Sequence, residues 1–305
     1  MKIAMFYGGA GDIESQVKAA QDYESQGFDG LFFGSVTGAD AMTVIAVAGQ
    51  KTSRIELGTS VVPTYLRHPT GMAMQALATQ AATGGRFTLG IGPSHKPFVE
   101  GMLGIPYDRP GIHTREYVSV LKPLLRGEQV SFQGEFFKVN GQVRVPGVEA
   151  PPVLISALAP VMLRTAGELA DGTITWMAGI KAVESHVTPR ITKAAREAGR
   201  PSPRIMVGLP VVATDDAAAA REKAARAFVV YGTLPNYQRI LERSGASGPA
   251  DVAIVGNEAE IERQLRDLVS AGATDFLAGM FTVGDDPKAS LQRTTECLAG
   301  LVGKI

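Results

Sequence analysis

The sequence is poor in cysteine and has no net charge. Cys297 is the one cysteine among 305 residues, which excludes a disulfide framework and a cysteine-based zinc site. Lys and Arg number 30, as do Asp and Glu, and no basic block occurs, so nucleic acid is not expected as the main partner. No apolar run approaches the roughly 18 residues of a membrane span, and no signal peptide precedes the first predicted strand. We therefore expect a cytoplasmic protein in a reducing setting, with a small molecule as its partner.

Several well-known catalytic motifs are also missing. No GxGxxG follows a strand, since Gly90-Ile91-Gly92 lacks the third glycine, and there is neither a Walker A lysine nor a GxSxG elbow. The four histidines show no metal-ligand spacing, so no catalytic metal is expected, although scattered carboxylates could still bind one. The site must therefore be located from the fold.

Short apolar segments alternate with amphipathic ones almost throughout the chain. The apolar segments predict strands at 2–7, 30–34, 55–62, 86–92, 152–156, 171–177, 204–213 and 274–281. The segments between them predict helices at 12–27, 40–50, 69–82, 113–126, 160–170, 181–198, 215–231 and 287–301, with one more that begins at a capping box of Asn257 and Glu260. The faces expected to turn inward hold Ile13, Val17 and Ala20 in one helix, and Ile261, Leu265, Leu268 and Val269 in another.

Eight such units in a chain of this length predict a (β/α)8 TIM barrel, with 1–305 as a single domain. The alternative is an open doubly wound sheet with a second lobe. Three interruptions, near 93–111, 127–150 and 232–250, are expected to be insertions that supply the substrate pocket. The first and last are predicted as loops, and 130–139 as a β-hairpin that turns at Gln133-Gly134.

In a barrel the chemistry belongs at the carboxyl ends of the strands. After the fifth strand, Ser156–Pro160 forms a small-residue turn before a helix, which predicts an anion site; an ordinary strand-to-helix turn is the alternative. The third strand is interrupted at Pro63, which allows a bulge against a flat ligand. Beyond it, Arg67 and His68 could bind an anion, but entry into the next helix is favoured.

Three further strand ends hold candidate side chains. His95 places an imidazole at the mouth after the fourth strand. Trp176, the single tryptophan, ends the sixth strand and could wall a pocket or cover the rim. Ser35 lies at the end of the second strand. His113 and His186 begin helical segments and are predicted to have surface or capping roles.

At these residues the sequence resembles the luciferase-like monooxygenase superfamily, and within it the F420-dependent oxidoreductase branch. The resemblance lies in 55–95, with the motif TSVVPTYLRHP, in 152–177, with PVLISALAP, and in 251–276. It covers nearly the whole chain and implies a TIM barrel with insertions, in agreement with the strand count. It also implies a homodimer.

The resemblance further implies positions for the site. A non-prolyl cis peptide would lie at Ser60-Val61, with Val61 against the central ring of the deazaflavin. The phosphate-binding turn would fall at Ser156–Pro160, where Leu158-Ala159 replace the glycine usual in the family. The second strand of the family often ends in Asp or His, and this chain has Ser35. The residues expected to contact the cofactor are Ser60, Val61, Thr64, Pro93, Ser94, Ser156, Ala157, Leu158, Ala159 and Trp176.

The chemistry implied is hydride transfer between C5 of coenzyme F420 and a small organic substrate. His95 is predicted to be the proton donor, with Ser35 as a lesser candidate. Substrate oxidation uses the same geometry, so the direction is open. The alternatives are an FMN-dependent monooxygenase of the same superfamily and a cofactor-binding protein without turnover.

Overall fold

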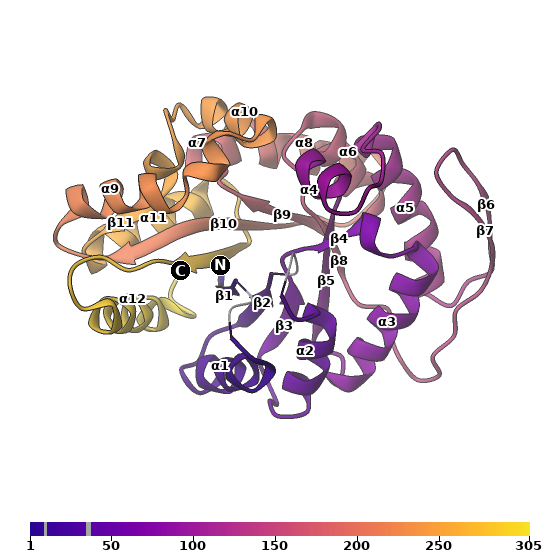
Figure 1. Cartoon of the computed structure of the whole chain (residues 1–305), viewed down its shortest axis with the longest axis horizontal. Helices are drawn as coiled ribbons and strands as arrows, with labels where there is room; N and C mark the ends of the chain where they lie inside the picture. The colour runs from indigo at the N-terminus through magenta and orange to yellow at the C-terminus, as the bar shows by residue number, and fades with distance from the viewer. Residues whose placement is uncertain (9–10, 35–37) are drawn as a thin grey trace.

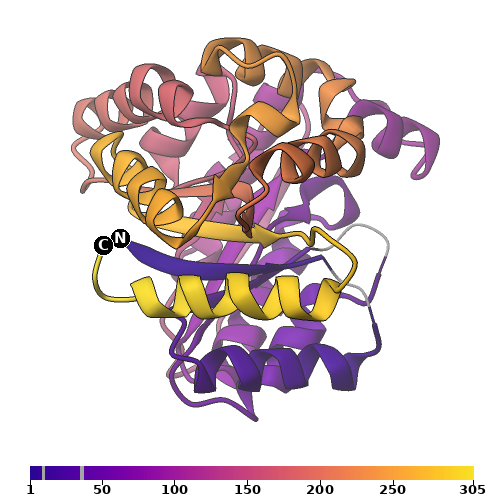
Figure 2. The ribbon, with the colours of Figure 1, turned by 90° about the vertical axis from the view of Figure 1, so that its left-hand side faces the viewer.

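The computed structural model describes residues 1–8, 11–34 and 38–305. In the described part, eight strand positions close into a parallel ring in which each strand pairs with the next and the last pairs with the first (Figures 1 and 2). In ring order they are β1 (Lys2–Tyr7), β2 (Gly30–Phe33), β3 (Glu56–Thr59), β5 (Phe87–Gly92), β8 (Val153–Ile155), β9 (Gly172–Trp176), β10 (Arg204–Ala213) and β12 (Asp275–Met280). β4 (Val62–Pro63) continues the line of β3 and pairs with β5. The predicted barrel is confirmed, and the open sheet is wrong.

Helices surround the strands, as Figure 1 shows. They begin where the sequence supplies caps: Asp12, Asp40 and Asn257 each accept a hydrogen bond from a backbone N–H of the first turn. The main helices around the ring are α1 (Ile13–Ser25), α2 (Ala41–Gly49), α3 (Pro69–Ala82), α5 (Pro110–Leu125), α6 (Pro160–Leu169), α8 (Thr188–Glu197), α9 (Ala217–Ala227), α11 (Glu258–Ser270) and α12 (Pro287–Leu301). α8 is preceded by α7 (Ile180–Ala182) and a π-helical turn (Val183–Val187). Among the described helices, none is long and apolar enough to cross a membrane.

Two predicted loops contain helices. α4 (Lys96–Gly101) lies in 93–111, and α10 (Pro235–Ser244) lies in 232–249. Both begin with a proline in the first turn, where the missing N–H costs nothing. The loop predictions were wrong, since a proline in the first turn permits a helix, and in α10 the side chains of Ile240 and Leu241 are buried.

The other departures are local. The helix predicted to end at 231 gives way to a 3-10 turn, η3 (Val229–Gly232), and the short strand β11 (Ile254–Gly256) adds to β10. The predicted hairpin is confirmed as β6 (Val130–Gln133) and β7 (Lys138–Gly141). Its turn is longer than predicted, since Gln133 pairs with Lys138.

Two side chains predicted to face inward do not. Ile13 is 43% exposed and Val269 is 40% exposed, whereas Val17, Ala20, Ile261, Leu265 and Leu268 are buried as predicted. The buried stripe of α1 includes Gln16 in place of Ile13, which is the first residue of the helix. Val269 follows the buried Leu268 by one residue and is therefore turned about 100° away from it.

The interior of the ring is filled in layers. A small apolar cluster occupies its middle, and Phe6 and Val61 pack above it at the carboxyl side. At the amino side Arg204 of β10 forms ion pairs with Glu56 of β3 and with Asp275 of β12, its nitrogens 2.5 and 2.6 Å from their oxygens. Since β3 and β10 lie opposite each other in the ring, this cluster closes the amino end, and the carboxyl end is left for a ligand. The middle cluster consists of Ala4, Phe32, Leu154, Ile174, Met206 and Leu277.

Candidate functional site

The third strand position is interrupted by a bulge at the barrel mouth. The Ser60-Val61 peptide bond is cis and lies between β3 and β4. The Thr59 hydroxyl donates to the Gly90 carbonyl at 2.7 Å and accepts from the Gly90 N–H at 2.9 Å, which ties the bulge to β5. No side chain fits at Gly90, because a Cβ there would lie 2.0 Å from the backbone carbonyl oxygen of Thr59. The predicted position of the cis bond is confirmed, and the Val61 side chain packs beside Phe6 over the barrel interior.

Ser156 lies beside this bulge, although 95 residues separate it from Val61 in the chain. A Cβ at Gly92 would lie 2.2 Å from Ser156 Oγ and 3.1 Å from Val61 Cγ2, so both side chains border the space above Gly92. The Ser156 N–H donates to the Ile91 carbonyl at 2.8 Å and extends the pairing of β8 with β5. The structure therefore brings the predicted turn and the predicted bulge together.

The turn between β8 and α6 leaves backbone donors open. Among the described residues, the N–H groups of Ala157, Leu158 and Ala159 have no backbone or side-chain acceptor. Ala159 is the N-cap of α6 and offers no side chain to its first turn, and Pro160 follows. Open amides at the positive end of a helix suit an anion. His186 is buried against this turn, with Nε2 2.7 Å from the Leu158 carbonyl oxygen, so its predicted surface or capping role was wrong.

His95 lies just after β5, as predicted for a residue at the mouth. It is the N-cap of α4, but its side chain makes no capping hydrogen bond. Burial holds the pKa of the imidazole below its usual range, so the ring is neutral at neutral pH. Its centroid lies 5.5 Å from that of Tyr237 of α10. The preceding Ser94 has a positive φ of 62°, and its carbonyl accepts a hydrogen bond from the Tyr107 hydroxyl at 2.9 Å.

Trp176 forms a wall of the mouth at the end of β9. Its indole lies over two glycines, since a Cβ would come within 2.8 Å of the ring at Gly208 and within 2.4 Å at Gly279. The ring packs against Phe6 on the barrel side, at 5.6 Å between centroids, and against Phe228 on the other, at 6.3 Å. Glycines on two neighbouring strands therefore make the room that the ring occupies.

A second aromatic cluster borders the bulge. Tyr65 stacks on His113 with ring centroids 4.0 Å apart, and Phe137 of the hairpin packs on the same imidazole. His113 is buried, so its predicted surface or capping role was wrong, and burial lowers its pKa to about 4. The Thr64 hydroxyl is buried and has no partner in the part of the chain that is described.

The segment after the bulge enters α3. His68 Nδ1 accepts a hydrogen bond from the Thr70 N–H at 3.3 Å, and Arg67 forms an ion pair with Asp40. His68 therefore serves helix entry, as favoured from the sequence, whereas Arg67 links Asp40 at the start of α2 to Gln75 of α3.

Sequence analysis did not identify three aromatic residues of the site, and one residue that it did name lies outside the described part of the chain. Phe6, Tyr231 and Tyr237 border Trp176 and His95 but were not singled out. Tyr237 could have been found because it lies in 232–250, one of the three segments expected to supply the substrate pocket. Ser35 lies outside the described residues. Within those residues, no group of three or more His, Cys, Asp or Glu side chains could hold a metal ion.

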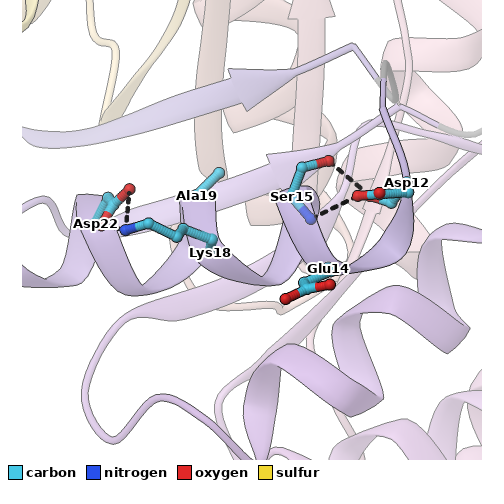
Figure 3. Close-up of a pocket in the computed structure, with 6 residues that line it drawn as sticks. All are labelled: Asp12, Glu14, Ser15, Lys18, Ala19 and Asp22. Atoms are coloured by element: carbon cyan, nitrogen blue, oxygen red, sulfur yellow. Dashed lines mark hydrogen bonds and ion pairs between the residues drawn. The ribbon is translucent and has the colours of Figure 1, made fainter.

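A surface depression along α1 is not part of this site. It has a volume of about 380 Å³ and is shown in Figure 3. Asp12 caps the helix through the Ser15 N–H, and Lys18 pairs with Asp22 at 2.8 Å, so these groups already have partners on the helix itself. The lining residues are Asp12, Glu14, Ser15, Lys18, Ala19 and Asp22.

Comparison with known proteins agrees with this geometry. The profile of the luciferase-like monooxygenase family matches residues 2–299. The chain belongs to the luciferase-like monooxygenase family. The match spans nearly the whole barrel, with the bulge, the α6 turn and α10 all inside it.

Among individual relatives, this luciferase-like chain is 29% identical over 280 residues to the 5,10-methylenetetrahydromethanopterin reductase of Methanolobus tindarius. The aligned region covers 90% of this chain and 84% of that protein. It is 30% identical over 233 residues to a Mycobacterium tuberculosis protein provisionally named a coenzyme F420-dependent oxidoreductase, covering 70% of this chain and 67% of that protein. Its fold matches the coenzyme F420-dependent tetrahydromethanopterin reductase of Methanopyrus kandleri with a TM-score of 0.83, at 21% identity, covering 99% of this chain and 98% of the other.

Proposed function

We propose that this luciferase-like chain is an F420-dependent oxidoreductase that transfers a hydride between the deazaflavin and a small organic substrate. The observation that carries the proposal is the meeting, at one mouth, of the Val61 bulge and the open amides before α6. The first suits a flat ring and the second a phosphate, and F420 has both. The relative provisionally named a coenzyme F420-dependent oxidoreductase supports the same choice.

The residues of the mouth fit this cofactor. Val61 would lie under the ring system, beside Phe6, with Trp176 at its edge. The Ser156 hydroxyl and the amides of Ala157 and Ala159 would hold the phosphate. When bound, F420 supplies or accepts a hydride at C5. We place the remaining predicted contacts, Ser60, Thr64, Pro93, Ser94 and Leu158, around the same molecule.

This chain's own contribution to the reaction is to position the substrate, exclude water and move a proton. We assign the proton transfer to His95, because the imidazole lies at the mouth without a capping hydrogen bond. In reduction the imidazolium would donate a proton to the substrate, and in oxidation the neutral ring would accept one. Since burial lowers the pKa of His95, the ring is better prepared at neutral pH to accept a proton than to donate one.

The test is binding of purified protein to F420 and to FMN in parallel titrations. We expect F420 to bind at least about tenfold more tightly. Tighter binding of FMN, with oxygen uptake in the presence of a flavin reductase, would instead establish the monooxygenase. Tight F420 binding without hydride transfer to any of a panel of enones and alcohols would establish a binding protein without turnover.

We also propose that residues 1–305 form one domain, that two copies form a homodimer and that the protein acts in the cytoplasm. Val47 of α2 and Met74 of α3 are 42% and 58% exposed on neighbouring helices and support an interface there. Sedimentation equilibrium tests the dimer, and cell fractionation tests the location.

A further inference from the structure

We infer that the substrate is an uncharged molecule with a flat ring, held by stacking on aromatic side chains and by no ion pair. This inference rests on the proposed function and names the substrate class of the same site. It starts from a continuous arc of rings beside the mouth, which we call the aromatic wall. The wall consists of Phe6, Trp176, Tyr231, Tyr237 and His95.

The wall is continuous from the barrel interior to the predicted proton-transfer residue. Successive ring centroids lie 5.6, 5.9, 4.9 and 5.5 Å apart, from Phe6 to His95. These spacings are those of packed aromatic pairs. A ring-bearing substrate that leaned on this wall would therefore have Phe6 and Val61 at one end and the imidazole at the other.

The wall is held in place by contacts between α10 and the end of β9. The Gly179 N–H, just after β9, donates to Ser244 Oγ of α10 at 3.0 Å. Ile240 and Leu241 bury the inner face of the same helix. These contacts fix α10, and with it Tyr237, against the strand end that carries Trp176.

The sequence segments at the strand ends carry no formal charge. The segments that follow the ring strands are 7–11, 34–37, 59–65, 92–95, 156–159, 176–179, 211–214 and 281–284, and none of them contains Asp, Glu, Lys or Arg. The stretch 228–237, which supplies Tyr231 and Tyr237, contains none either. In a chain with 60 charged residues, this leaves only His95 and tyrosines as titratable groups in these segments.

The titratable groups of the wall are neutral as well. Burial lowers the pKa of His95 and raises those of Tyr231 and Tyr237, so all three are uncharged near pH 7. Lys96, directly after His95, is exposed and lies 3.2 Å from Glu100 on its own helix, which already supplies an opposite charge. A carboxylate or ammonium group on the substrate would lose water here without finding a partner, and this disfavours charged substrates.

The experiment compares two probes of the same shape: 2-acetylnaphthalene, which is neutral, and 6-acetyl-2-naphthoate, which carries a carboxylate. Each is titrated by isothermal calorimetry at pH 7.5 into the F420-loaded protein and into the protein alone. We expect the neutral probe to bind at least about tenfold more tightly than the carboxylate. Tyr237→Ala should weaken the neutral probe about tenfold, and Tyr237→Phe, which keeps the ring, should leave it within about twofold. Tyr231→Ala is the second variant, should Tyr237→Ala fail to fold by circular dichroism.

Three results would overturn the inference. They are a carboxylate that binds as tightly as the neutral probe, a neutral probe unaffected in both alanine variants, and no binding of either probe. The proposed function is judged separately, by F420 affinity. If F420 does not bind, that proposal falls, and the effect of Tyr237→Ala on the neutral probe, titrated into the protein alone, still decides whether the wall binds rings.

Discussion

At the scale of single residues, His95 is the group on which the proposed reaction depends. Its ring is neutral at neutral pH because burial lowers its pKa. For substrate oxidation we therefore expect kcat/KM to be level near pH 7 and to fall in acid, below the histidine's usual pKa of about 6.5, as the imidazole takes up a proton. For substrate reduction the dependence should have the opposite sign.

His95→Gln tests this assignment. The variant should lower kcat by about 10²- to 10⁴-fold in either direction and abolish the acid limb of substrate oxidation, while F420 affinity is unchanged. His68→Asn is the matched control, since it removes a histidine and keeps a good N-cap for α3. An acid limb that persists in His95→Gln would assign the proton transfer to another group.

Single residues show where the sequence sufficed for the site and where it did not. Ser156 and Trp176 come at the ends of strands with clear patterns, so their places at the mouth could be predicted. The Ser60-Val61 cis bond was implied by the family resemblance and not by the strand pattern. His113 and His186 were assigned to the surface because each starts a helical segment, and periodicity does not reveal which loops fold back over a helix start. The hairpin covers the first and the β8–α6 turn covers the second.

At the scale of elements, the N-terminus of α6 combines two roles that conflict. A capping side chain would add to the stability of this helix, yet Ala159 supplies none. The backbone amides at the start of the helix therefore stay open. We expect Ala159→Asp to stabilise the protein by about 1 kcal/mol and to weaken F420 binding at least about tenfold, since its carboxylate would occupy the amides and repel the phosphate.

Ala159→Asn separates the two causes, because it caps the helix without a charge. Thermal unfolding gives the gain in stability, and a fluorescence titration gives the F420 affinity. Equal weakening by Asn and Asp would show that blocked amides are the cause. Unchanged affinity in both variants would mean that the phosphate binds elsewhere.

Elements were predictable where their pattern was long. β1, β10, α3 and α12 have the predicted bounds. α4 and α10 were missed because each is short and begins at a proline, and their helical state depends on packing against the barrel rather than on local propensity. The aromatic wall could not be predicted for this reason, since Tyr237 lies in α10.

At the scale of the whole molecule, the two ends of the barrel differ in charge. The amino end holds the partly buried Arg204 with Glu56 and Asp275, and the strand-end segments at the carboxyl side contain no Asp, Glu, Lys or Arg. Arg204→Met would leave two carboxylates close together without their cation. We expect it to lower the free energy of unfolding by about 3–5 kcal/mol.

Urea unfolding measures this change. Lys2→Met is the matched control, because its exposed ammonium lies 3.4 Å from Glu56 and should contribute less than about 1 kcal/mol. A loss below about 1 kcal/mol for Arg204→Met would show that the cluster contributes little to closing the ring.

The fold at this scale was the most predictable feature, because eight strand–helix units of regular length have few ways to close. The ion cluster was not predicted, since its members come from β3, β10 and β12 and meet only after closure.

The position of Trp176 has a practical consequence. It is the single tryptophan in the chain, and it lies in the wall between the barrel interior and α10. Its emission therefore comes from one known place, without the background that other indoles would add. Occupancy of the mouth can be followed in the unlabelled protein, in real time, by the quenching and lifetime of this natural fluorophore.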